Sequence, residues 1–220
     1  MSDLKELQEK IISCQKCPRL MKYIKEVSEK PPKRFRNWNY WAKPVPSFGD
    51  ENAEIGIIGL APAANGGNRT GRLFTGDHSG DWLFKALYEV GLSNKPISHD
   101  INDGLKVFNV YITAVIHCAP PQNKPSKEEI NNCLPYLIEE LKELKKLKVI
   151  IALGKIAFDT INSLYNVKYE FKHLAKYKLP DGKWMIASYH PSARNTNTGL
   201  MKWDDWVSVF KTAKEIAGGK

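Results

Sequence analysis

The sequence contains no apolar run long enough to cross a bilayer, and its first ten residues, MSDLKELQEK, are polar. A membrane-spanning helix needs about 20 consecutive apolar residues, and a secretory signal peptide needs an apolar stretch near the N-terminus. The sequence therefore predicts a cytoplasmic protein with no membrane partner. It also lacks internal repeats and low-complexity tracts. Its 220 residues, 42% of them hydrophobic, predict one globular domain that spans residues 1–220.

Acidic residues are scarce relative to basic ones. The chain has 24 Asp and Glu against 33 Lys and Arg, which gives a formal net charge of +9. Such an excess suits a polyanionic partner such as nucleic acid, and a lysine-rich solvated surface produces the same excess. Charge alone leaves both interpretations open.

Cysteine is also rare, with only four residues in the chain. They are Cys14, Cys17, Cys118 and Cys133. In a cytosolic protein an even set that includes C-x-x-C indicates metal or redox chemistry rather than disulfides. Four thiolates suit either zinc or an iron–sulfur cluster, and the proline directly after Cys17 favours the cluster. Four chemically inert buried cysteines are the alternative. A cluster would tie the N-terminal helices, expected at about residues 3–30, to the rest of the fold.

Four segments rich in Ile and Val predict strands. They are EIGIIGL (54–60), KVFNVYITAVI (106–116), KVIIALG (148–154) and KWMIASYH (183–190). Amphipathic helical patterns follow them at residues 79–90, 126–145, 155–164 and 201–217. Apolar strands that alternate with helices predict an α/β fold of three layers, α/β/α, with a four-stranded parallel central sheet. Ser126 is the expected N-cap of its helix.

Three long polar loops follow the first, second and fourth of these strands, at residues 59–77, 117–125 and 190–199. Ligands of parallel sheets bind at the carboxyl ends of the strands, so we expect the loops to line one cleft. The first loop matches neither G-x-x-x-x-G-K-[ST] nor G-x-G-x-x-G, the usual phosphate-binding patterns. Ordinary turns, which are rich in the same residue types, are the alternative.

Three features taken together resemble the uracil-DNA glycosylase superfamily, and most closely its fifth, iron–sulfur family. They are GLAPAANGGNRTGRLFTGDHSGDWL (59–83), HPSARNTNTG (190–199) and the pattern of four cysteines. The resemblance extends from Cys14 to about Lys202. It implies a four-stranded parallel sheet between helices and a structural 4Fe–4S cluster on the four cysteines. It further implies base-excision repair by hydrolysis of the N-glycosidic bond of uracil, hypoxanthine or xanthine in DNA, with base flipping and without strand cleavage.

The resemblance also implies roles for three candidate catalytic residues. His190 would donate a hydrogen bond to the departing base, while Asp77 and Asn123 would handle the attacking water. Each has a purely structural alternative. His190 could be a hydrogen-bonded histidine at a strand end, Asp77 could stabilise a helix N-terminus, and Asn123 could be a turn residue.

A second set of residues is expected to bind the substrate. It consists of Gly59, Leu60, Ala61, Ala63, Phe74, Ser192, Arg194 and Asn195. Phe74 matches the aromatic residue that stacks on the extruded base, and core packing is its alternative. Arg194 and Asn195 would fill the space that the base leaves, and Ser192 would contact phosphate. The small residues of the first loop imply a roomy pocket.

Two other functions remain open at this level. One is a non-catalytic iron–sulfur module that binds nucleic acid and assists replication or repair, and the other is a redox or structural metalloprotein. No lysine in the matching motifs invites a Schiff base, so a monofunctional glycosylase is expected. A monomer is expected because it fits an enzyme that scans DNA. His78 is assigned to the surface. The basic and aromatic segment that contains Lys33, Arg34, Arg36 and Trp38 is either a DNA-backbone contact or a packed coil.

Overall fold

A six-stranded sheet forms the middle layer of the computed structural model, which describes residues 3–218. The strand order is β1-β3-β2-β4-β6-β5. The bounds are β1 (Phe48–Gly49), β2 (Ile55–Gly59), β3 (Val110–Ala114), β4 (Val149–Leu153), β5 (Lys176–Lys178) and β6 (Trp184–Ser188). The four central strands β3, β2, β4 and β6 run parallel. They coincide with the four apolar segments, and burial on both faces explains why those segments are continuously apolar.

The two edge strands correct the expected strand number. β1 pairs antiparallel with β3, and β5 pairs antiparallel with β6. Both are only two or three residues long, and β5 carries two exposed lysines in the sequence KYK. Short, charged edges of this kind protect a sheet from pairing with another chain. Because they carry no apolar run, the hydrophobic pattern does not reveal them.

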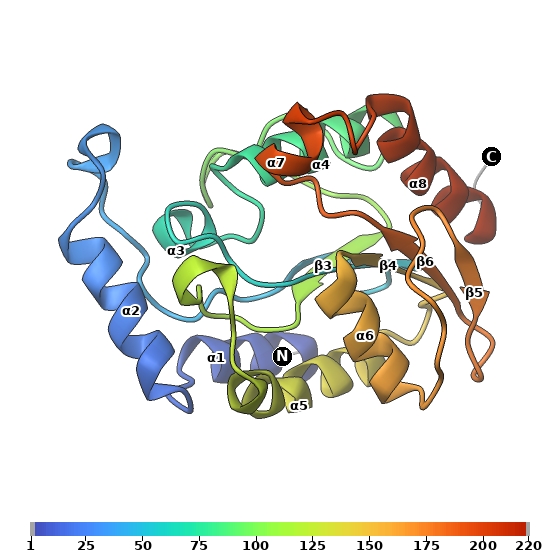
Figure 1. Cartoon of the computed structure of the whole chain (residues 1–220), viewed down its shortest axis with the longest axis horizontal. Coiled ribbons are helices and arrows are strands. Elements are labelled where there is room, and N and C mark those ends of the chain that lie inside the picture. Colours follow the sequence, from blue (N-terminus) through green and yellow to red (C-terminus); the bar gives the residue numbers. More distant parts are fainter. Residues whose placement is uncertain (1–2, 219–220) are drawn as a thin grey trace.

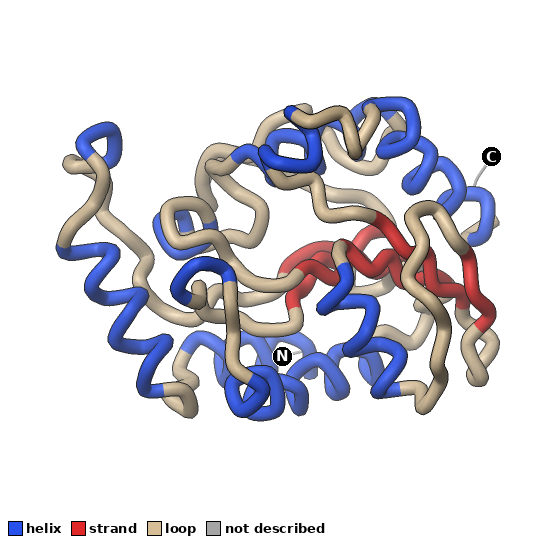
Figure 2. The backbone as a smooth tube through the Cα atoms, viewed as in Figure 1, coloured by secondary structure: helices blue, strands red, loops and turns tan. Residues whose placement is uncertain are grey.

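Helices cover both faces of the sheet, so the expected three-layer α/β/α class is confirmed (Figures 1 and 2). The longer helices are α1 (Asp3–Ile12), α2 (Pro18–Glu29), α4 (His78–Glu89), α5 (Lys127–Glu143), α6 (Lys155–Leu164) and α8 (Trp203–Ile216). The short ones are η1 (Lys33–Phe35), α3 (Gly67–Thr70), η2 (Pro121–Asn123) and α7 (Ala193–Asn197). In Figure 1, α4, α7 and α8 lie above the sheet, and α1, α5 and α6 lie below it. No helix within residues 3–218 is both long and apolar enough to span a membrane.

Local signals explain where several helices begin. Ser126 caps α5 by accepting a hydrogen bond from the Glu129 N–H, and the Glu129 carboxylate accepts one from the Ser126 N–H. This reciprocal capping box confirms the predicted N-cap. Pro18 occupies the first turn of α2, where its missing N–H has no cost.

Each face of the sheet has its own hydrophobic core. One includes Phe84, Trp206 and Phe210 from α4 and α8, and the other includes Leu137 and Phe158 from α5 and α6. A buried carboxylate, Glu140, anchors α1 to the second face because it accepts hydrogen bonds from Gln8 and Thr113. The first helix is therefore bound to the sheet through protein contacts.

The loop after β2 is fastened by two buried arginines. The Arg72 guanidinium donates to Ser98 Oγ at 2.6 Å and to Asp103 Oδ2 at 2.8 Å. Burial raises the pKa of Asp103, but the hydrogen bonds from Arg72 and from backbone N–H groups outweigh it and lower this pKa to about 2. Arg69, which is 4% exposed, donates to the carbonyl oxygens of Asn65 and Gly76. These bonds fix the loop that leads to α4.

We expect Asp103→Asn to lower the free energy of unfolding by about 3 kcal/mol, because it leaves the buried Arg72 cation without its counter-charge. Urea denaturation at neutral pH measures the change. The control is Asp159→Asn, which removes an exposed ion pair with Lys155 and should cost less than about 1 kcal/mol. Equal stability of the two variants would contradict the role assigned to Arg72.

Candidate active site

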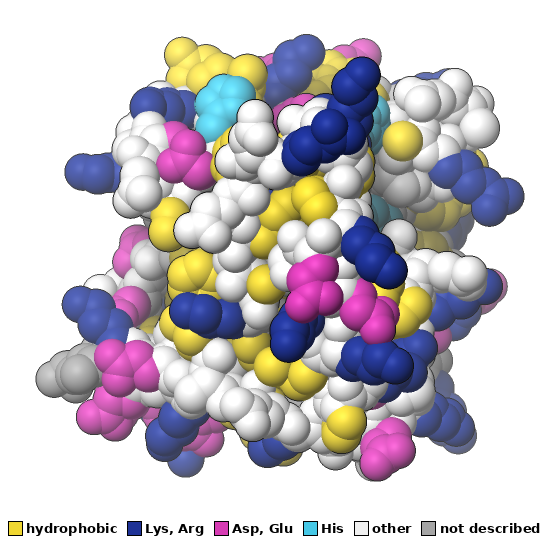
Figure 3. All heavy atoms as spheres, turned by 90° about the vertical axis from the view of Figure 1, so that its left-hand side faces the viewer, with side chains coloured by type: hydrophobic (Ala, Val, Ile, Leu, Met, Phe, Trp, Pro, Cys, Tyr) yellow, Lys and Arg dark blue, Asp and Glu magenta, His cyan; other side chains and the backbone are white. Residues whose placement is uncertain are grey.

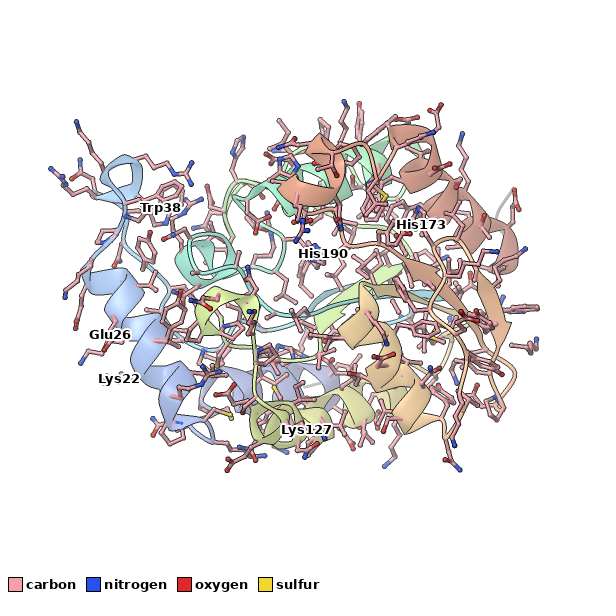
Figure 4. All side chains as sticks on the ribbon, viewed as in Figure 1. Lys22, Glu26, Trp38, Lys127, His173 and His190 are labelled. Carbon is pink, nitrogen blue, oxygen red and sulfur yellow. The ribbon has the colours of Figure 1, made fainter. Side chains whose placement is uncertain are left out.

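A pocket of about 400 Å³ lies where the loops after β2, β3 and β6 meet, as the parallel order predicts. It is lined by Leu60, Ala61, Ala63, Phe74, Asp77, His78, Ser79, Asn123, His190, Ser192 and Ala193. All three expected catalytic residues and most of the expected substrate-binding residues are therefore brought together. Figure 4 shows His190 near the middle of the molecule, between α7 and the strand ends.

Phe74 forms one wall of the pocket in a strained conformation. Its φ is +53°, which bulky residues rarely adopt. A Cβ at Gly59 would lie 2.7 Å from the Phe74 ring, and a Cβ at Gly80 would clash with the Phe74 carbonyl oxygen. Only glycine at both positions allows this packing. Phe74 is 8% exposed and also belongs to the core, so the packing and pocket-lining interpretations both describe it.

His190 faces Phe74 across the pocket, with ring centroids 6.1 Å apart and planes inclined by 26°. Burial lowers the pKa of His190 to about 4, so the imidazole is neutral at pH 7. Asn195 Nδ2 donates to the His190 backbone carbonyl at 2.8 Å and so fixes the main chain of this residue. No group within residues 3–218 hydrogen-bonds to the His190 ring, which leaves its N–H able to meet a ligand.

Asp77 combines the structural role considered for it with a place in the pocket. Its Oδ1 accepts a hydrogen bond from the Gly80 N–H at 2.6 Å and caps α4. Its Oδ2 has no donor among the described residues, although the side chain lines the pocket. Burial raises the pKa of Asp77 above its ordinary value, while the Gly80 N–H acts in the opposite direction. This carboxylate is therefore held in place by one oxygen and able to orient water with the other.

Asn123 lies on the rim of the pocket at the end of η2. Both it and Gln122 have positive φ values, near +56°. Asparagine tolerates this left-handed region better than most residues, which agrees with the turn considered as the alternative role of Asn123. The side chain is exposed and lines the pocket together with Asp77 and His190.

The third loop forms α7, a helix of five residues that the sequence pattern did not reveal. Ser192 caps it by accepting a hydrogen bond from the Asn195 N–H at 3.2 Å, and its side chain lines the pocket. Arg194 is exposed on α7 and does not line the pocket. Asn195 was expected to bind the substrate, but it does not line the pocket and instead hydrogen-bonds to the His190 backbone carbonyl.

His78 shows what the sequence interpretation missed. It is exposed, as expected, yet it lines the pocket and its Nε2 lies 2.7 Å from Thr196 Oγ1 of α7. This hydrogen bond joins the start of α4 to α7 across the rim. A histidine next to Asp77, at the predicted start of a helix beside the site, was the available signal.

The four cysteines line a second, narrow pocket between α1, α2 and α5, together with the apolar side chains of Ile11, Leu20 and Ile116. All four are free thiols. Asn132 Nδ2 lies 3.6 Å from Cys17 Sγ. Within residues 3–218, no group of three or more His, Cys, Asp or Glu side chains is arranged to hold a metal ion.

Burial disfavours the thiolate form of Cys118 and Cys133 in this pocket. Burial, reinforced by the neighbouring thiols, raises the pKa of Cys133 to about 12, and the same causes raise the pKa of Cys118. Four thiolates crowded into an apolar pocket repel one another, and a bound metal centre removes that penalty. The four cysteines therefore have the donor chemistry of a thiolate-bound metal centre, although the described side chains are not arranged around one ion.

Comparisons with known proteins show which family contains a chain of this sequence. Residues 46–213 match the family model of the uracil DNA glycosylase superfamily. The chain is 44% identical to the type-5 uracil-DNA glycosylase of Pyrobaculum aerophilum, over 95% of this chain and 91% of that protein. It is also 44% identical to the type-5 enzyme of Thermus thermophilus, over 94% of this chain and 95% of that protein. The type-4 uracil-DNA glycosylase of Archaeoglobus fulgidus is 30% identical over 100% of this chain and 96% of that protein.

The matched residues include the loops after β2, β3 and β6, and the type-5 relatives extend the match across the cysteines. Both the polar pocket and the thiol pocket thus lie inside the region of similarity. The resemblance read from the motifs is confirmed, and the chain belongs to the uracil DNA glycosylase superfamily and to its type-5 family.

Proposed function

We propose that the protein is a DNA glycosylase that hydrolyses the N-glycosidic bond of uracil in DNA as a step of base-excision repair. The observation that carries the proposal is the single pocket lined by Phe74, Asp77, Asn123 and His190 in a chain of this superfamily. A base inside a duplex is out of reach, so the target nucleotide must be extruded, at a cost of a few kcal/mol. The pocket, at about 400 Å³, lies within the usual range of small-molecule sites.

The chemistry requires two groups on opposite sides of the scissile bond. As that bond breaks, the sugar develops positive charge and the base leaves with the bonding electron pair as an anion. The neutral His190 imidazole donates its N–H to a carbonyl oxygen of the departing base. The Asp77 carboxylate and the Asn123 side chain orient a water whose oxygen bonds to the sugar carbon. The proton that this water loses balances the charge of the base anion, which leaves as the neutral base.

The site favours hydrolysis without strand cleavage. No lysine within the described residues lines the pocket, so no amine is placed to form a Schiff base with the sugar. The product is an abasic site in an intact strand. The small side chains of Ala61 and Ala63 leave room for larger rings, and we extend the proposed substrates to hypoxanthine and xanthine.

We also propose that Cys14, Cys17, Cys118 and Cys133 hold a 4Fe–4S cluster that links α1 and α2 to the loop after β3 and to α5. When bound, the cluster supplies a structural cross-link, and none of its four cysteines lines the active-site pocket. The pattern of four free thiols around one pocket supports this assignment. We further assign the protein to the cytoplasm, where thiols stay reduced, and to a monomeric state.

Wild-type protein should convert an oligonucleotide with a central uracil into an alkali-labile product, with no break before alkali. His190→Ala should slow the single-turnover rate by about 10²–10³, the usual loss for one preorganised donor. His99→Ala, an exposed histidine outside the pocket, is the matched control and should keep the wild-type rate. Wild-type protein that binds the oligonucleotide but yields no alkali-labile product would identify a binding module instead.

The pH profile should reflect the two shifted groups. Burial raises the pKa of Asp77, so its ionised form is lost as the pH falls through that raised value. The single-turnover rate should therefore begin to fall at a higher pH than it would with an ordinary Asp, whose pKa is about 3.9. The pKa of His190, about 4, predicts no break near pH 6.5. Asp77→Asn should be slow and should lose the acidic limb. A midpoint near 6.5 that His190→Ala abolishes would contradict the neutral-donor role.

Protein purified without oxygen should be brown and contain iron and sulfide in about a 4:4 ratio per chain, as expected for four cysteine ligands. Elemental analysis and visible absorption measure this. Cys118→Ser should lose the colour and unfold at lower temperature, because the link between the loop after β3 and the N-terminal helices is gone. Colourless wild-type protein that contains zinc would refute the iron assignment.

A further inference from the structure

Residues 33–43, which we call the basic arm, project beside the active site between α2 and β1. Figure 1 shows the arm as the blue segment at the upper left, across from α7. From Lys30 to Gly49 the chain contains no Asp or Glu, while the arm itself carries the cationic side chains Lys33, Arg34, Arg36 and Lys43. It also carries four large aromatic residues, and the proposed chemistry uses none of them.

The arm is a packed coil, which was one of the two interpretations of this segment. The Arg69 guanidinium lies between two of its rings, 3.8 Å from the Phe35 centroid and 4.1 Å from the Trp38 centroid. The Tyr40 hydroxyl donates to Asn65 Oδ1 at 2.7 Å. The Trp41 backbone N–H donates to the Arg69 carbonyl at 3.0 Å. Arg69 belongs to the loop that carries Asp77, so the arm and the active-site loop form one unit.

A pocket of about 390 Å³ connects the arm to the active site. Arg34 and Phe35 line it from the arm side. It shares Ala63, Asp77 and His78 with the active-site pocket, so the two pockets adjoin. Asp81 also lines this pocket, and Arg34 is the cation that a strand leaving the active site in this direction would meet there.

Beyond the Arg69 stack lies an outer pocket of about 570 Å³. Trp38, Tyr40, Trp41 and Lys43 form one side of it, and residues 100–102 form the other. Trp38 is 39% exposed, so a large part of its apolar ring is in contact with solvent. Figure 4 shows this residue on the arm. Figure 3 shows this side of the molecule, where dark-blue lysine and arginine atoms lie among yellow hydrophobic ones.

We propose that the basic arm binds the DNA strand that flanks the extruded nucleotide, and that one base of this strand stacks on Trp38 in the outer pocket. Aromatic faces combined with cations are the usual means of holding an unpaired strand without reading its sequence. The inference deepens the proposed function and rests on DNA as the substrate. It makes the arm the counterpart of α7, so that the strand is held on both sides of the active-site pocket.

The charges within the outer pocket set the orientation of the strand. Asp100 lies on the wall opposite the aromatic residues, and its Oδ1 accepts a hydrogen bond from the Asn102 N–H. A phosphate beside this carboxylate would be repelled, whereas a phosphate on the side of Arg69 and Lys43, which line the same pocket, would be attracted. The base therefore enters the pocket toward Trp38 and Ile101, and the phosphates face Arg34 and Lys43.

The test places 2-aminopurine, whose fluorescence falls when it stacks, at each position on either side of the uracil in a single-stranded oligonucleotide. One position should be quenched on binding, and Trp38→Ala should abolish that quenching and weaken binding about tenfold. Tyr88→Ala, which removes an aromatic side chain 51% exposed on α4 outside these pockets, should match wild type. Quenching that survives in Trp38→Ala, or an equal affinity of the two variants, would overturn the proposal.

A second measurement avoids changing Trp38, because Trp38→Ala also removes a ring that packs on the Arg69 guanidinium. Arg34→Ala and Lys43→Ala should each reduce the slope of log affinity against log salt by about 0.7, the value for one phosphate contact on a single strand. Lys176→Ala, on the edge strand β5, is the charge-matched control and should keep the wild-type slope. Slopes unchanged in both arm variants would overturn the proposal.

The same oligonucleotides separate this proposal from the proposed function. If wild type releases uracil while Trp38→Ala and Tyr88→Ala bind DNA equally well, the DNA-binding role of the basic arm is refuted and the glycosylase activity stands. No uracil release, with binding that still depends on Trp38 and Arg34, refutes the glycosylase and retains a DNA-binding arm.

Discussion

The close packing around Phe74 is the constraint on which the active site depends. Its ring lies against Gly59 at the end of β2, and its carbonyl oxygen lies against Gly80 in the first turn of α4. A side chain at either glycine would push the loop outward. This double contact folds the loop back over the sheet edge, so that the ring faces His190 and Asp77 reaches the N-terminus of α4.

Such packing carries a conformational cost. A bulky residue at φ +53° costs about 1–3 kcal/mol, and the surrounding structure must offset it. The offset comes from behind the loop, where the buried guanidinium groups of Arg69 and Arg72 hydrogen-bond to its backbone and to Ser98 and Asp103. Hydrogen bonds to charged groups contribute about 1.5–3 kcal/mol each, which is enough to hold one strained residue. The arginines of this loop therefore stabilise the scaffold of the active site.

The sequence predicted those parts of the fold that follow from a repeated pattern. Strands buried on both faces must be continuously apolar, so β2, β3, β4 and β6 were found, and their parallel order brought the three loops to one edge. The edges β1 and β5 are too short to show a pattern. Burial of Arg69 and Arg72 was missed for a different reason. A basic residue in a glycine-rich loop is usually solvated, and only the folded loop places acceptors around its guanidinium.

The distribution of charge follows from what each part of the surface must do. Among the described residues, no lysine or arginine lines the active-site pocket, although the chain as a whole carries a net charge of +9. A fixed cation in the pocket would bind a phosphate of the ground state as strongly as the developing base anion, and equal stabilisation of both states does not speed the reaction. A neutral imidazole interacts weakly with the intact nucleotide and more strongly as negative charge appears on the base. The basic residues of the outer surface thus attract DNA over long range, and the neutral His190 imidazole in the pocket stabilises the transition state more than the ground state.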